Sequence, residues 1–87
     1  MTHPIKSRRG VYYDLEKSPY EFTSPYGDIF KFSSEKKMDI YTRDIDAQLA
    51  RFDKVIERFQ LDQIVMPIMI SEIRRAIYQS FYRQVER

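Results

Sequence analysis

The spacing of apolar positions predicts two long helices in the second half of the chain. Between residues 34 and 60, apolar side chains recur every third or fourth position, so they lie on one face of a single helix. These positions are Met38, Tyr41, Ile45, Leu49, Phe52, Ile56 and Phe59. Ser33 or Ser34 suits the start of this helix, because a serine hydroxyl can accept from an amide of the first turn.

A second helix is predicted from Pro67 almost to residue 87. Proline favours the first helical turn, and the residue before it avoids the helical region, so we expect residues 60–66 to be a connection. The second apolar stripe has the same helical spacing and consists of Ile70, Ile73, Ile77, Phe81 and Val85.

A different periodicity precedes the helices and predicts a β-hairpin. Aromatic and other side chains alternate over residues 20–23 and 29–32. Tyr20 and Phe22 therefore face one side of the strand, and the positions between and after them face the other. The same holds for Phe30 and Phe32. Residues 24–28 contain a proline and a glycine and join the two segments, and their number predicts a bulged or wider loop. A short extended piece over residues 11–18 is expected to pack across this hairpin.

These elements define an α+β fold class: a β-hairpin, with or without a third short strand, packed on two long antiparallel α-helices. Residues 11–87 are expected to form a single small ββαα domain, and residues 1–10 a flexible basic arm. A chain of 87 residues has a thin core, which contacts with a partner could complete. The first ten residues contain no apolar run typical of a signal peptide, and we expect no contact with a membrane.

The residue types present argue against catalytic and metal chemistry. The chain has no cysteine, and its single histidine, His3, lies in the arm. Gly10 and Gly27 are the only glycines, which excludes a glycine-rich phosphate loop. Acidic residues of the first helix alternate with basic ones, which is typical of a solvated, salt-bridged face. We therefore expect no enzyme, no catalytic or metal-binding residue and no cofactor.

The distribution of charge and aromatic residues suggests a surface for a partner. The formal net charge is only +2, but residues 1–10 carry +3 and residues 61–87 carry +1. The arm either contacts phosphates or an acidic protein surface, or is a solvated tail. Arginine and tyrosine together are frequent at protein interfaces and on single-stranded nucleic acid. The candidate interface consists of Lys6, Arg8, Arg9, Tyr12, Tyr13, Arg74, Arg75, Tyr78, Tyr82 and Arg83.

The sequence YGDIFKFSSEK at residues 26–36, followed by a helix, resembles the nucleus of a YHS-type domain. Metal-binding members of that family carry cysteines in this region. Ser33 stands at the matching position, so the resemblance does not imply metal binding here. The wider pattern over residues 11–82, which starts with YYDLEKSPY at 12–20, is similar to small proteins of short-tailed phages of Gram-positive bacteria.

The second resemblance implies a phage protein, and in particular a virion component near the portal vertex. Our first hypothesis is a non-enzymatic structural adaptor of the virion, present in several copies and bound to neighbouring capsid or portal subunits. The alternative is a small early protein in the cytoplasm of the bacterial host that binds nucleic acid or a host protein. Self-association into a homo-oligomer and contact with nucleic acid both stay open at this point.

Overall fold

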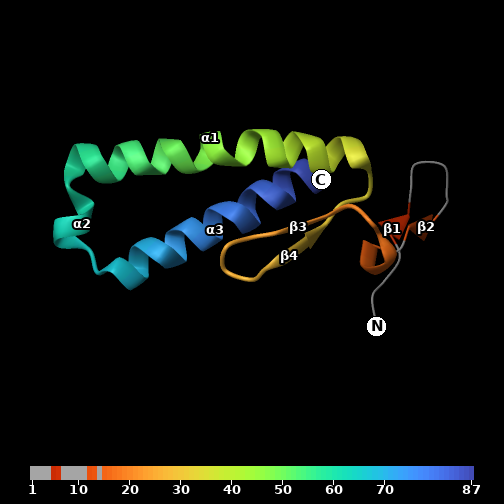
Figure 1. Cartoon of the computed structure of the whole chain (residues 1–87), viewed down its shortest axis with the longest axis horizontal. Helices are drawn as coiled ribbons and strands as arrows, with labels where there is room; N and C mark the ends of the chain where they lie inside the picture. Colours follow the sequence, from red (N-terminus) through yellow and green to blue (C-terminus); the bar gives the residue numbers. More distant parts are fainter. Residues whose placement is uncertain (1–4, 7–11, 14) are drawn as a thin grey trace.

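The structure, a computed structural model, describes residues 5–6, 12–13 and 15–87 (Figure 1). Its elements, in chain order, are β1 (Ile5–Lys6), β2 (Tyr12–Tyr13), the 3₁₀ turn η1 (Leu15–Lys17), β3 (Glu21–Thr23), β4 (Ile29–Lys31), α1 (Glu35–Phe59), α2 (Leu61–Ile64) and α3 (Pro67–Glu86). The α+β class, with one hairpin and two long antiparallel helices, is confirmed. A short strand does form in residues 11–18, but β2 pairs with β1 in a separate two-stranded sheet and not with the hairpin.

The hairpin forms at the predicted segments and has the predicted wider loop. Phe22 lies opposite Phe30 in the antiparallel ladder. The amide of Ser24 donates to the carbonyl of Asp28 over 2.8 Å, which closes a loop of three residues. Gly27 takes a φ of 86° within that loop, a left-handed conformation that glycine adopts without strain. The Ser24 hydroxyl accepts from the amides of Tyr26 and Asp28, both over 3.2 Å, and so holds the loop from inside.

The boundaries of α1 follow from its two caps. The Ser34 hydroxyl accepts from the amide of Lys37 over 3.2 Å, which settles the choice between the two serines. At the other end, Gln60 takes a left-handed φ of 51° and interrupts the helix. The expected connection over residues 60–66 contains one further helical turn, α2, closed by the amide of Val65 donating to the carbonyl of Leu61 over 2.7 Å. Pro67 then starts α3, as predicted.

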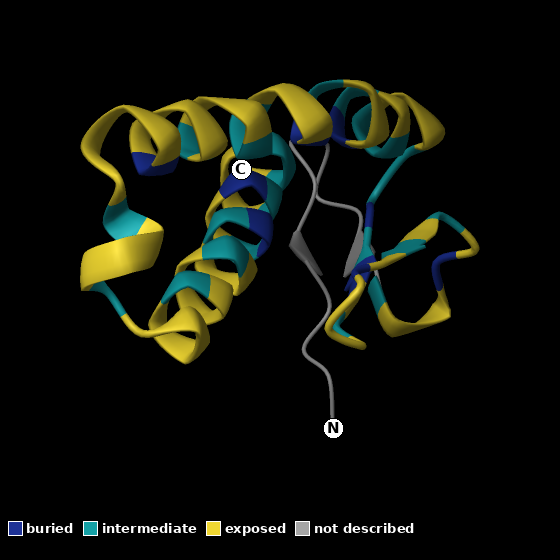
Figure 2. Ribbon diagram, turned by 60° about the vertical axis from the view of Figure 1, so that its left-hand side comes forward, coloured by how far each residue is buried: buried dark blue, intermediate teal, exposed yellow. Residues whose placement is uncertain are grey.

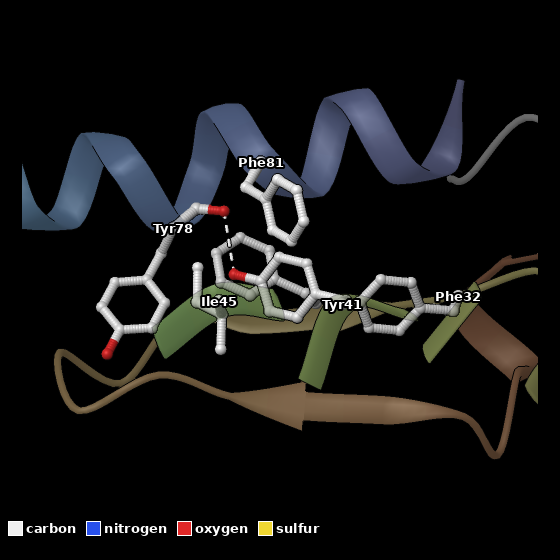
Figure 3. Close-up of a cluster of buried hydrophobic side chains, with 6 residues drawn as sticks. Phe32, Tyr41, Ile45, Tyr78 and Phe81 are labelled. Carbon is white, nitrogen blue, oxygen red and sulfur yellow. Dashed lines mark hydrogen bonds between the residues drawn. The ribbon is translucent and has the colours of Figure 1, made fainter. Parts of the chain in front are cut away.

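The core lies at one end of the helix pair, where the hairpin packs against both helices. Tyr41 of α1 is fully buried at its centre, with ring centroids of Phe22, Phe32 and Phe81 between 5.2 and 5.3 Å away. Its hydroxyl donates to the carbonyl of Tyr78 on α3 over 2.9 Å (Figure 3). Rings from three elements therefore meet around one side chain, and the hydrogen bond satisfies the polar group that burial would otherwise penalise.

The molecule is elongated, because the hairpin covers only part of the helix pair. The principal extents are 50, 24 and 18 Å. The radius of gyration is 15.7 Å, against about 12 Å for a compact domain of this length. The hairpin lies beside the C-terminal half of α3, whereas α2 and the adjoining ends of α1 and α3 extend away from it (Figure 1). Figure 2 shows that the ribbon of this second region is mostly exposed.

Candidate docking surface

The predicted interface residues on α3 are used largely to hold the hairpin. The guanidinium of Arg75 donates twice to the carboxylate of Asp28, from Nε over 2.8 Å and from Nη2 over 2.7 Å. The hydroxyl of Tyr82 donates to the carbonyl of Lys31 over 2.6 Å. These two contacts fasten the loop end and the far end of β4 to α3.

Tyr78 belongs to the core. Only 8% of its surface is exposed, and its ring packs against Phe22 and Tyr26 of the hairpin. Tyr78 was predicted to be part of the candidate interface, but the structure buries it against the hairpin. Tyr82 is half-buried between Phe30 and Phe32, with ring centroids 4.9 and 5.2 Å away. The row formed by the two tyrosines is the face on which the hairpin packs.

Burial and hydrogen bonds change the acidity of several of these groups. Burial raises the pKa of the Tyr41 phenol well above its usual value, and the charge of ionised Tyr78 would raise it further. Burial likewise raises the pKa of Tyr82, with a contribution from the nearby carboxylate of Glu86. The hydrogen bonds from Arg75 lower the pKa of Asp28, and its positive charge acts in the same direction. These shifts move the pKa values of the groups away from neutral pH.

The remaining arginines of the predicted interface differ in their surroundings. Arg74 forms an ion pair with Asp53 of α1, and its guanidinium lies 5.6 Å from the ring centroid of Phe52. It therefore bridges the two helices rather than pointing freely into solvent. Arg83 is exposed near the end of α3. Whether Arg74, Arg75 and Arg83 contact a partner stays a prediction.

The predicted interface residues of the N-terminal segment are only partly covered by the structure. Lys6 lies in β1, and Tyr12 and Tyr13 lie in β2, where their backbones pair across the small sheet. Arg8 and Arg9, and with them most of the predicted basic arm, lie outside the described residues.

The structure adds a surface that was not among the predicted interface residues. Large apolar side chains are exposed around the turn formed by α2, the end of α1 and the start of α3. We call this surface the distal apolar end. It consists of Val55, Phe59, Ile64, Met66, Ile68, Met69 and Ile73. The exposed fraction ranges from 43% for Val55 and Ile73 to 77% for Ile64. Isolated apolar residues on a surface are ordinary, but a gathered set of this kind is typical of surfaces that contact a partner.

The sequence held a signal for this surface. The longest apolar run covers residues 64–70, and both helical stripes continue to the α2 end. Each hairpin strand has only three residues, or about 10 Å of length. The 25-residue α1 is nearly 40 Å long. A hairpin of that size can cover only part of the two stripes, and the rest must remain open or meet a partner.

The described residues offer little for other kinds of site. Among them, no group of three or more His, Cys, Asp or Glu side chains is placed to hold a metal ion. Every helix in that part of the chain is too short or too polar to traverse a lipid bilayer. One shallow hollow lies on α1 alone and is lined by Glu35, Lys36, Asp39, Ile40, Thr42 and Arg43. A hollow built from one helix face lacks the convergence of several elements that binding sites for small molecules show.

Comparisons with models of protein families, with curated proteins and with solved structures found no match for this chain. The functional argument therefore rests on the distal apolar end, on the chemistry of the residues around it and on the sequence pattern described above.

Proposed function

We propose that this protein is a non-enzymatic structural adaptor that docks onto protein subunits through its distal apolar end. The observation that carries the proposal is the unequal burial of the two ends of the helix pair. At the hairpin end, Phe32 and Tyr41 are fully buried, whereas at the other end Phe59 and Ile64 are 57% and 77% exposed. Burying that apolar surface against another subunit would be favourable by the same effect that forms the core.

The setting we propose is a phage particle, in which several copies bind neighbouring capsid or portal subunits. The likeness of residues 11–82 to small proteins of short-tailed phages supports this setting. A thin core with one open apolar end supports it further, because small subunits of an assembly often complete their burial in contacts with neighbours.

The alternative role in binding nucleic acid receives less support from the described surface. Three arginines, Arg43, Arg74 and Arg75, pair with carboxylates of this chain. Phosphate contacts make binding strongly dependent on salt. Binding to DNA at low salt that weakens steeply as salt is raised would favour the alternative over the adaptor.

The adaptor proposal is tested by incorporation into particles. Mass spectrometry of purified virions should detect the wild-type chain, and Ile68→Glu should reduce its amount per particle. Ile29→Glu is the matched control, because Ile29 is similarly exposed, at 59% against 62% for Ile68, but lies on the hairpin. Equal incorporation of both variants would refute docking through the distal apolar end. Absence of the wild-type chain from virions would refute the proposed setting.

A further inference from the structure

We infer that the occupant of the distal apolar end is a second copy of this chain, so that two molecules associate end to end in a symmetric dimer. The inference rests on the proposed function and names the partner of the same surface. Three features favour a second copy: the exposed area, the missing layer over the helices and the balance of charge around the surface.

The exposed area is close to what a stable dimer needs. The seven side chains are between 43% and 77% exposed. At roughly 200 Å² for each large residue, they leave on the order of 800 Å² of mostly apolar surface open. An interface of standard size buries about 800 Å² on each partner. A monomer rarely leaves so much apolar surface exposed at one end in water.

A second copy would supply the layer that the distal end lacks. At the other end, the hairpin packs on the helix pair, and the core cluster extends along the helices only as far as Leu49 and Tyr78. Beyond that point Ile56 is still buried, at 9% exposed, but Phe59 and Ile73 continue the two stripes and remain more than 40% exposed. Another molecule carries the same two stripes at the same helical spacing. Two such helix pairs can pack together as the four helices of a bundle do.

The charges around the surface suit contact with an identical molecule. Residues 51–74 span the distal apolar end and carry four basic and four acidic side chains. In an isologous interface each residue meets the same surface of the partner, so a rim with a large net charge of one sign would repel its own copy. A neutral rim with both signs avoids that repulsion. It also lacks the excess of Lys and Arg that is typical of helices lying on anionic membranes.

The test is the dependence of mass on concentration for the full chain. Sedimentation velocity from about 1 µM to about 1 mM detects a dimer whose dissociation constant lies within or below that range. The wild type is expected to shift from its monomer mass of 10.6 kDa towards twice that value. Ile68→Glu is expected to weaken the dimer at least tenfold, because it places an uncompensated charge within the interface. A carboxylate in the first turn of α3 favours the helix, so the variant should still fold. Ile29→Glu is expected to dimerise like the wild type.

A second readout uses the absence of cysteine from the chain. Ile64→Cys, Ile68→Cys and Met69→Cys place single thiols on the distal apolar end, and Ile29→Cys places one on the hairpin. Oxidation should give linked dimers for at least one of the first three and none for the control, because a disulfide needs Cα atoms within about 7 Å.

The outcomes separate the dimer from the broader docking proposal. A wild type that stays at 10.6 kDa over the whole range would overturn the dimer, and so would equal self-association of the wild type and Ile68→Glu. If Ile68→Glu is nevertheless lost from particles, the surface docks onto a different protein and the proposed function survives. If the variant is incorporated normally as well, both proposals fail.

Discussion

The hydroxyl of Tyr41 offers a direct test of how the core is held together. Tyr41 is fully buried, and its ring lies 5.2 Å from Phe22, 5.8 Å from Phe30 and 5.3 Å from Phe81. Tyr41→Phe keeps these contacts and removes only the hydrogen bond to the Tyr78 carbonyl, which spans 2.9 Å. A neutral hydrogen bond of this kind contributes about 1 kcal/mol, against a total stability of roughly 4–13 kcal/mol for a chain of this length.

The same substitution should change how stability depends on alkaline pH. Burial raises the pKa of Tyr41 in the folded protein above its usual value of 10.0. A raised pKa means that the folded chain keeps the phenol proton up to a higher pH than the unfolded chain does. Stability is therefore unaffected below pH 10 and falls as the pH rises towards the folded pKa. Tyr41 alone should contribute a loss of up to about 1.4 kcal/mol per pH unit to the wild type in that window. Tyr41→Phe lacks this contribution, so the two stabilities should converge and cross between about pH 10.5 and pH 11.

Urea unfolding followed by circular dichroism at pH 7 and at several values above pH 10 measures both effects. The dependence on denaturant should be unchanged, since the surface exposed on unfolding is the same. Tyr26→Phe is the control, because Tyr26 is 38% exposed at the hairpin loop, and its stability should change by less than about 0.5 kcal/mol. Equal stability of Tyr41→Phe and the wild type at pH 7, or parallel curves above pH 10, would refute the role assigned to the hydroxyl.

Three further predictions concern the contacts that fix the ends of the elements. Arg75→Ala should destabilise the protein more at pH 7 than near pH 2. The lowered pKa of Asp28 means that its stabilising contribution is present above the ordinary pKa of 3.8 and is lost as the pH falls through the pKa of the folded state. Equal effects by urea unfolding at both pH values would contradict this. Ser34→Ala should lower the melting temperature through a loss of about 1 kcal/mol, and Ser34→Asp should retain most of it, since aspartate also caps helices. The Glu86 carboxylate accepts from the amide of Ser33 over 3.1 and 3.2 Å beside the start of α1, so Glu86→Gln should cost about 0.5 kcal/mol at low salt, measured by thermal unfolding, and less at high salt.

The helices and the hairpin could be predicted from the sequence because their signals are local. The stripe spacing, the capping serine and Pro67 act within a few residues of the boundaries that they set. The turn α2 was not predicted, because four residues carry no periodicity and its start depends on the left-handed conformation of Gln60.

The role of α3 could not be read from its own pattern. A single stripe assigns one buried face, but this helix packs on α1 through Phe81 and on the hairpin through Tyr78 and Tyr82. Tyrosine suits both an interface and a core, so only the position of the hairpin decides between them. The pairing of Arg75 with Asp28 spans 47 residues and has no local signature.

The aromatic core also constrains the order in which the chain can assemble. Its closing contacts join distant segments: Tyr41 and Tyr78 lie 37 residues apart, and Lys31 and Tyr82 lie 51 residues apart. The hairpin and the first helix can form from neighbouring residues, but the rings of α3 cannot join those of the hairpin and α1 until the chain has reversed direction after Gln60. Closing a loop of several tens of residues lowers the chain entropy before any contact with α3 in the core can offset that loss. We therefore expect the folding rate to depend on the chain reversal over residues 60–66, at the opposite end of the molecule from the side chains that it brings together.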